Sequence, residues 1–128
     1  MDIKKRILII EDDLILARMY QKMLLNHNFY VAVAEDGEQG LAMYQKTHHD
    51  LVLLDIRMPV MDGMTVLGKI REDKLGINVP VILFTNLDMN DERFAKVVKN
   101  QPAFYLIKSN TSPQMLIEKI NDILNIKK

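Results

Sequence analysis

The fold of this chain is decided by the stretch Asp50-Leu-Val-Leu-Leu-Asp55-Ile-Arg-Met-Pro59-Val-Met-Asp62-Gly63. Its four consecutive apolar residues, 51–54, are typical of a strand buried inside a parallel sheet. Asp55 follows them at once, so its carboxylate is expected at the C-terminal edge of that sheet. Open α/β sheets bind their ligands at this edge. The sequence therefore predicts that Asp55 is a reactive group.

The composition is that of one globular domain, and we expect residues 1–128 to form it without a linker. The 17 Lys and Arg residues balance 17 Asp and Glu residues, so no basic field predicts direct nucleic-acid binding. The absence of cysteine excludes disulfides and thiol catalysis and fits a reducing, cytoplasmic environment. No apolar run is long enough to span a membrane.

Apolar patterns predict five strands that alternate with five helices. The other strands are expected over residues 7–10, 29–33, 79–84 and 103–107. The helices are expected from about residue 16 to 27, from 36, from about 63 to 70, from about 90 to 99, and from 112. Such alternation predicts right-handed βαβ units, and therefore a parallel sheet covered by helices on both faces.

Side-chain patterns add detail to four of these helices. Met19 and His27 are expected on the inner face of the first helix, and Asp13, Asp36, Asp62 and Ser112 are expected as helix caps. His48 and His49 are both interpreted as surface residues, because adjacent residues cannot easily share one metal ion.

Polar residues follow four of the predicted strands and should meet at one edge of the sheet. They are Glu11-Asp12-Asp13, Asp55, Thr85-Asn86 and Lys108. Crowded carboxylates repel one another, and Mg²⁺ is the cation that best suits such oxygen ligands. A metal, an ammonium and a hydroxyl together can stabilise the oxygens of a transferring phosphoryl group. The pattern thus suits the formation of an aspartyl phosphate on Asp55.

Over nearly its full length the chain resembles the receiver domains of two-component response regulators. The resemblance rests on the acidic residues after the first strand, on Asp55-x-x-Met58-Pro59-x-x-Asp62-Gly63, on Thr85 and Lys108, and on Tyr105 three residues before that lysine. It implies a flavodoxin-like three-layer α/β/α sandwich whose five parallel strands lie in the order 2-1-3-4-5.

The resemblance also implies a role for each site residue. Asp55 would accept phosphate, Thr85 and Lys108 would bind the phosphoryl oxygens, and Thr85 and Tyr105 would form the switch. Mg²⁺, or Mn²⁺ in its place, would be bound by the side chains of Asp12 and Asp55, by the backbone carbonyl of Arg57, and through water by Glu11. The domain would catalyse only its own phosphorylation and dephosphorylation and would not be a turnover enzyme.

Two residues depart from the pattern of this family. Ser109 stands where most receivers have a proline in a cis peptide, and Asn86 stands where Ala or Gly is usual. A cis bond without proline costs about 3–4 kcal/mol, so we predict a trans Lys108–Ser109 peptide. Asn86 is expected either to narrow access to Asp55 or to hydrogen-bond the phosphate.

The resemblance implies a histidine kinase or a histidine phosphotransfer protein as the partner. Leu14, Ile15 and Leu25 fall away from the core stripe of the first helix and would form the docking surface, although isolated surface apolar residues are also common. Phosphorylation would reshape the face made by the fourth helix, the fifth strand and the fifth helix, where a homodimer or an output partner would bind. No direct contact with nucleic acid or membrane is expected.

Two alternative functions are compatible with the residues. One is a phosphorylation-independent interaction module, which Ser109 and Asn86 would favour. The other is a small Mg²⁺-dependent phosphatase with an aspartyl nucleophile, but it would need a general acid at residue 57, where the chain has arginine.

Overall fold

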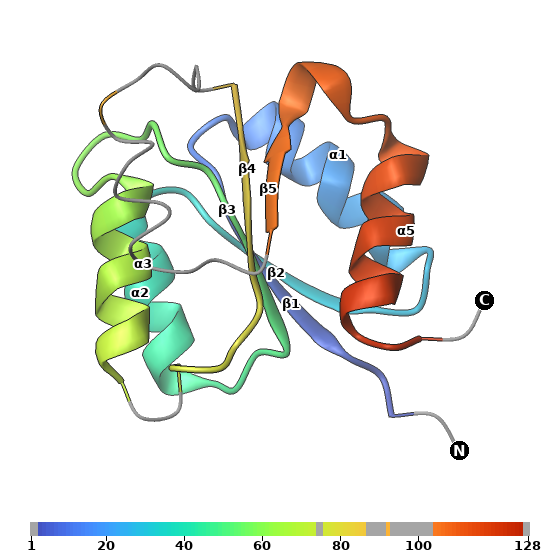
Figure 1. Cartoon of the computed structure of the whole chain (residues 1–128), viewed down its shortest axis with the longest axis horizontal. Helices are drawn as coiled ribbons and strands as arrows, with labels where there is room; N and C mark the ends of the chain where they lie inside the picture. Colours follow the sequence, from blue (N-terminus) through green and yellow to red (C-terminus); the bar gives the residue numbers. More distant parts are fainter. Residues whose placement is uncertain (1–2, 74–75, 87–91, 93–103, 127–128) are drawn as a thin grey trace.

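The computed structural model describes residues 3–73, 76–86, 92 and 104–126, which form three layers with a central sheet between helices (Figure 1). The five strands are all parallel and lie in the order 2-1-3-4-5, as predicted. They are β1 (Arg6–Ile10), β2 (Tyr30–Ala34), β3 (Leu51–Leu54), β4 (Val81–Thr85) and β5 (Phe104–Ile107).

Helices cover both faces of this sheet. Helices α2 and α3 lie on one face, and α1 and α5 lie on the other (Figure 1). Their bounds are α1 (Leu14–Leu25), α2 (Gly37–Lys46), α3 (Gly63–Glu72) and α5 (Pro113–Ile123), with a 3₁₀ turn, η1 (Lys108–Asn110), after β5. The helix predicted over about 90–99 lies outside the described residues. Within the described part of the chain, no helix has the length and apolar character needed to cross a bilayer.

Each of the four α-helices begins at a side chain that accepts a hydrogen bond from a backbone N–H of the first turn. The caps are Asp13, Asp36, Asp62 and Ser112. Each accepts from the N–H three residues later, at distances between 2.8 and 3.2 Å. These bonds satisfy amides that have no partner inside the helix. All four caps are those expected from the sequence.

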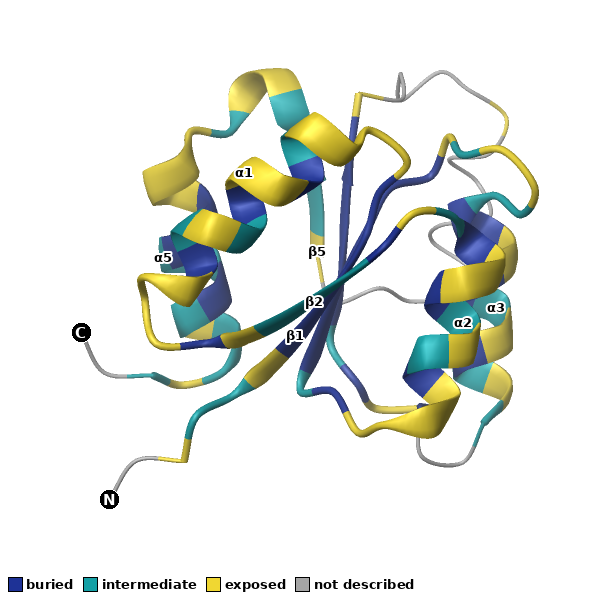
Figure 2. Cartoon of the chain, turned by 180° about the vertical axis from the view of Figure 1, so that it is seen from behind, coloured by how far each residue is buried: buried dark blue, intermediate teal, exposed yellow. Residues whose placement is uncertain are grey.

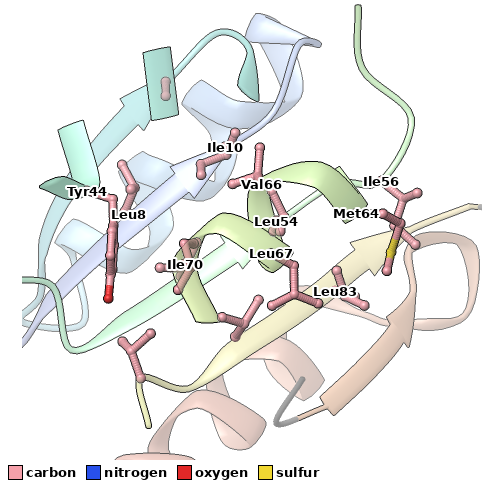
Figure 3. Close-up of a cluster of buried hydrophobic side chains, with 14 residues drawn as sticks. Leu8, Ile10, Tyr44, Leu54, Ile56, Met64, Val66, Leu67, Ile70 and Leu83 are labelled. Carbon is pink, nitrogen blue, oxygen red and sulfur yellow. The ribbon is translucent and has the colours of Figure 1, made fainter. Parts of the chain in front are cut away.

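The sheet separates two hydrophobic clusters. Alternate strand residues point to opposite faces, so neighbours in the sequence enter different clusters. Figure 3 shows the cluster under α2 and α3, where Leu8, Ile10, Leu54 and Leu83 meet Val66, Leu67 and Ile70. The second cluster lies under α1 and α5 and contains Ile7, Ile9, Leu53 and Ile82. Both faces of β1, β3 and β4 are therefore buried.

Two predictions about side-chain burial are wrong. Met19 is 51% exposed and His27 is also exposed, because α1 turns Ala17, Tyr20 and Leu24 toward the sheet instead. Figure 2 shows the exposed side of α1 in yellow. The exposed residues of α1 include Leu14, Ile15 and Leu25, as expected.

His49 is the second correction, because it is 6% exposed rather than on the surface. It lies two residues before the start of β3, and its ring stacks on Tyr44 with 6.4 Å between centroids. Burial lowers the pKa of His49, which favours the neutral ring. His48 is exposed as predicted and its Nε2 lies 3.1 Å from the carboxylate of Asp50.

Candidate functional site: an acidic pocket at the carboxyl ends of the strands

The carboxyl ends of the parallel strands point toward the top of Figure 1 and carry the polar residues that the sequence singled out. Glu11 follows β1, Asp55 follows β3, Thr85 ends β4 and Lys108 follows β5. The strand register brings Ile10 level with Leu54, so the two acids after them stand side by side. The site is thus built by residues 97 positions apart in the chain.

Asp55 is buried, with 7% of its surface exposed, and both of its carboxylate oxygens are held. Oδ1 accepts a hydrogen bond of 2.7 Å from the N–H of Ile56. Oδ2 accepts one of 3.0 Å from Nζ of Lys108. The backbone N–H of Asp55 donates to the carbonyl of Ile10 at 3.1 Å and anchors the residue to β1. The carboxylate is therefore fixed in orientation at the rim.

Lys108 joins the two buried acids. Its ammonium donates to Oδ2 of Asp55 and to Oε1 of Glu11, and its side chain is half-buried. Burial alone would lower the pKa of Lys108, but the hydrogen bonds to Glu11 and Asp55 outweigh it and raise the pKa. The lysine therefore remains a cation in the pocket.

Glu11 has the most perturbed carboxyl group of the pocket. Burial raises the pKa of Glu11 to about 7, the ammonium of Lys108 opposes that rise, and the charge of Asp55 adds to it. The second oxygen of Glu11 accepts from the N–H of Asp13 at 3.2 Å. Burial thus makes Glu11 hold its proton more tightly than a solvent-exposed glutamate does.

The carboxylates provide a donor set that suits a hard divalent cation. One oxygen each from Glu11, Asp12 and Asp55 lie within 4.8 Å of one another, and Asp12 is exposed while the other two are buried. Carboxylate oxygens at an open rim match the preference of Mg²⁺ for a few protein oxygens together with water. Of the predicted ligands, the structure brings these three together, and the carbonyl of Arg57 stays a prediction.

Thr85 and Tyr105 lie on adjacent strands and on the same face of the sheet. Leu83 pairs with Tyr105, and Thr85 stands two residues beyond Leu83. Thr85 is 1% exposed, whereas Tyr105 is half-buried and packs against the cluster under α2 and α3. A displacement of Thr85 would therefore occur on the face that holds the tyrosine ring.

The loop after Lys108 differs from the cis arrangement that a proline would allow. None of the peptide bonds between described residues is cis, so Lys108–Ser109 is trans as predicted. Oδ1 of Asn86 accepts a hydrogen bond from the N–H of Ser109 at 2.9 Å. The expected narrowing of access to Asp55 and the expected bond to the phosphate stay predictions. The sequence singled out both residues but did not predict that they pair.

Sequence reasoning also missed two features beside Asp55. Tyr20 was not singled out from the sequence, yet it lines a small cavity with Glu11, Asp55 and Phe84, and its ring meets Phe84 edge to face. Val60, in the loop between β3 and α3, has a φ of 70°. The position of Tyr20 beside the acids depends on how α1 packs against the sheet, and valine at residue 60 gives no signal of positive φ.

The pattern of this pocket agrees with a known family. The family model described as "Response regulator receiver domain" matches residues 7–121. The chain belongs to this family. It is a receiver domain of two-component systems, and receiver domains in general are not turnover enzymes.

Relatives of this receiver domain agree with the assignment. It is 38% identical over 88 residues to the response regulator PleD of Caulobacter vibrioides. The aligned residues cover 69% of this chain but only 19% of PleD. The receiver domain therefore spans about a fifth of that relative.

Solved structures share the fold. A CheY-like receiver domain protein from Methanospirillum hungatei JF-1 is 28% identical, with a TM-score of 0.88 over 96% of this chain and 95% of that one. The receiver domain of the sensor histidine kinase PA1611 from Pseudomonas aeruginosa PAO1 has a TM-score of 0.83 at 24% identity over 94% and 97% of the two chains. The latter holds a magnesium ion in its active-site cleft.

Proposed function

We propose that Asp55 accepts a phosphoryl group from the phosphohistidine of a histidine kinase or a histidine phosphotransfer protein. The observation that carries the proposal is the position of Asp55, buried at the sheet edge with Oδ2 3.0 Å from the ammonium of Lys108. An anionic nucleophile beside a fixed cation can approach a phosphoryl group whose own negative charge that cation offsets.

The proposed step is a transfer of the phosphoryl group from nitrogen to oxygen. A carboxylate oxygen of Asp55 forms a bond to phosphorus while the bond between phosphorus and the imidazole nitrogen breaks. The electron pair of that bond leaves with the imidazole, which can take a proton from solvent. Lys108 and the hydroxyl of Thr85 donate to the phosphoryl oxygens as charge shifts onto them.

We assign the metal role to Glu11, Asp12 and Asp55, with the backbone carbonyl of Arg57 completing the protein ligands and Glu11 acting through water. The support is the set of carboxylate oxygens within 4.8 Å of one another. Bound Mg²⁺ or Mn²⁺ would supply positive charge to the phosphoryl oxygens. Asp55 would then serve as both ligand and nucleophile.

The proposed switch couples Thr85 to Tyr105. The hydroxyl of Thr85 would move toward the phosphate, and the ring of Tyr105 would turn into the space that it leaves. Both residues lie on the same face of β4 and β5, which supports such coupling. The altered surface would include β5 and α5 and would receive an output partner or a second copy of the chain.

The phosphodonor protein is proposed to dock on the exposed apolar side of α1. Leu14, Ile15 and Leu25 all face away from the core there, and α1 begins just after the acidic residues of the pocket. In this proposal residues 1–128 act as one receiver domain in the cytoplasm. The domain catalyses only its own phosphorylation and dephosphorylation and makes no direct contact with nucleic acid or membrane.

The test is intact mass spectrometry after incubation with Mg²⁺ and acetyl phosphate. We expect one added phosphate, which should be absent from Asp55→Asn and from a sample containing a chelator. Asp13→Asn is the matched control, because it also converts an acid to an amide near the pocket while retaining a side chain that can cap α1. An adduct that survives Asp55→Asn would contradict the proposal.

No observation favours the alternative functions. Ser109 and Asn86 would favour the interaction module, but Nζ of Lys108, the residue before Ser109, still lies 3.0 Å from Asp55. The interaction module would be supported by a protein that takes no phosphate at any Mg²⁺ concentration but still binds its partner. A phosphatase would show turnover of phosphate esters without an adduct, but the side chain at position 57 is an exposed arginine.

A further inference from the structure

The residues that directly follow Thr85 and Lys108 are joined by a hydrogen bond. The backbone N–H of Ser109 donates to Oδ1 of Asn86 at 2.9 Å. This bond links the loop after β4 to the turn after β5, where these two adjacent strands end. We call the pair Asn86–Ser109 the loop latch.

The loop latch depends on the chemistry of both positions. Ser109 contributes its backbone N–H, which every residue except proline would supply. Asn86 contributes a side-chain carbonyl, which an alanine or a glycine would lack. The donor is an N–H, so the acceptor must be the amide oxygen of Asn86. An amide oxygen at position 86 can therefore form this hydrogen bond only when residue 109 is not proline.

The turn that carries Lys108 is held at both ends. At its far end, the N–H of Thr111 donates to the carbonyl of Lys108 at 3.3 Å, and the hydroxyl of Thr111 donates to the carbonyl of Ile107 at 2.8 Å. At its near end, the loop latch fixes Ser109 to the end of β4. Lys108 directly precedes Ser109, and its carbonyl accepts from Thr111, so both bonds restrain the backbone from which its side chain reaches Asp55.

We propose that Asn86 is a positioning residue that holds Lys108 in reach of Asp55 through the backbone of Ser109. The proposal rests on the phosphoacceptor function of Asp55 and adds a residue that does not itself touch the phosphoryl group. Loss of the latch frees one end of the turn, so Lys108 contacts the reacting group less often. The backbone of the acids that follow β1 and β3 is not held by the latch, so the effect should reach the pocket through Lys108.

Two substitutions at residue 86 distinguish the loss of the hydrogen-bond acceptor from a change in side-chain size. Asn86→Ala and Asn86→Leu both remove the acceptor, and Leu keeps a side chain of similar size. At saturating Mg²⁺, both should lower kcat for phosphorylation by acetyl phosphate about 3- to 10-fold, which corresponds to the loss of one hydrogen bond, with KM for the donor unchanged. Ser109→Ala is the control and should match the parent, because its backbone N–H remains.

Amide exchange measured by NMR tests the latch without phosphorylation. The amide proton of residue 109 should exchange slowly in the parent and in Ser109→Ala. It should also exchange slowly in Asn86→Asp, because aspartate keeps an oxygen in the same place. It should exchange rapidly in Asn86→Ala and Asn86→Leu. The ¹⁵Nζ signal of Lys108 should broaden or shift in those two variants alone.

The outcomes distinguish this proposal from the phosphoacceptor function. If Asn86→Ala leaves both amide exchange and kcat unchanged, or if Ser109→Ala lowers kcat as much as Asn86→Leu, the latch does not position Lys108. Rapid exchange in Asn86→Ala with an unchanged kcat and Lys108 signal would also overturn it. If the parent takes no phosphate, the function of Asp55 fails, and the Ser109 and Lys108 signals still decide the latch.

Discussion

Val60 has a backbone conformation that β-branched residues rarely adopt. Its φ is 70°, and the N–H of Met61 donates to the carbonyl of Pro59 at 2.8 Å, so the hydrogen bond closes a turn over Val60 alone. Such γ-turns with positive φ are strained and occur near functional sites. The exposed valine side chain gains no burial that would offset this cost.

Replacing Val60 by asparagine should therefore stabilise the domain. Asparagine tolerates positive φ, so Val60→Asn is expected to raise the free energy of unfolding by about 1 kcal/mol. Urea denaturation followed by circular dichroism measures this change. Ile77→Asn is the control, because Ile77 is also exposed but is not among the residues with positive φ, and it should change stability by less than about 0.5 kcal/mol. Equal effects of the two substitutions would show that Val60 is not strained.

At the scale of elements, the start of α3 packs closely against the backbone of Asp55 and Ile56. The N–H of Gly63 donates to the carbonyl of Ile56 at 2.8 Å. A Cβ atom at position 63 would lie 2.1 Å from the carbonyl oxygen of Asp55, closer than any real contact. The helix can approach the end of β3 this closely only because residue 63 is glycine.

Gly63→Ala should consequently affect both stability and phosphorylation. The clash is with backbone, so α3 or the end of β3 must shift, and we expect a loss of about 2 kcal/mol or more in the free energy of unfolding. The rate of phosphorylation by acetyl phosphate should also fall, because Asp55 moves with its backbone. Thr65→Ala, in the exposed first turn of the same helix, should leave that rate unchanged. A Gly63→Ala protein with parental stability and rate would contradict this account.

The exposed side of α1 is the element where partner docking can be separated from chemistry. Ile15 is 87% exposed. Ile15→Glu should slow phosphotransfer from a phosphorylated histidine phosphotransfer protein roughly tenfold, because a charge replaces an apolar contact. Phosphorylation by acetyl phosphate should not change. Ile77→Glu serves as the control, because Ile77 precedes β4 at the opposite edge of the sheet; a loss of the same size there would argue against docking on α1.

Elements and site residues differ in how far the sequence could predict them. Apolar runs identified the five strands, and the polar residues after them identified the pocket, because parallel strands bring their ends to one edge. Met19 was misplaced because several helical faces of α1 are apolar, and only packing against the sheet selects one. The pairing of Asn86 with Ser109 was not predicted, because it joins loops 23 residues apart.

At the scale of the whole molecule, two titrating groups at opposite edges of the sheet affect stability in opposite directions. Glu11 follows the carboxyl end of β1, and its pKa is raised from 4.5 to about 7 by burial. The folded state therefore binds the proton more tightly, and stability falls as pH rises from 4.5 to about 7. His49 precedes the amino end of β3, and burial lowers its pKa from 6.5, so stability falls as pH drops below 6.5.

Replacing either residue should remove its own contribution to the change of the free energy of unfolding with pH, so that the contribution of the other remains. Without divalent cations, Glu11→Gln should become more stable relative to the parent as pH rises from roughly 5 to 6.5. His49→Phe, which keeps a ring against Tyr44, should gain relative stability as pH falls over the same window. The Glu11→Gln difference should change by roughly 1–2 kcal/mol over this window, because one proton contributes at most about 1.4 kcal/mol per pH unit. The His49→Phe difference should change in the opposite direction, and urea denaturation at several pH values measures both. Slopes of the same sign in both variants would contradict the assigned pKa directions.

The separation of the core into two clusters has a consequence for how the domain can change over time. Ile9 and Ile10 are neighbours in the sequence, yet one packs under α1 and α5 and the other under α2 and α3. Substitutions on opposite faces share no packing partners, so their costs should be nearly additive. Each face can then be repacked independently, and helices on one side can be adapted to a new partner while the strand ends keep Asp55 and Lys108 in place.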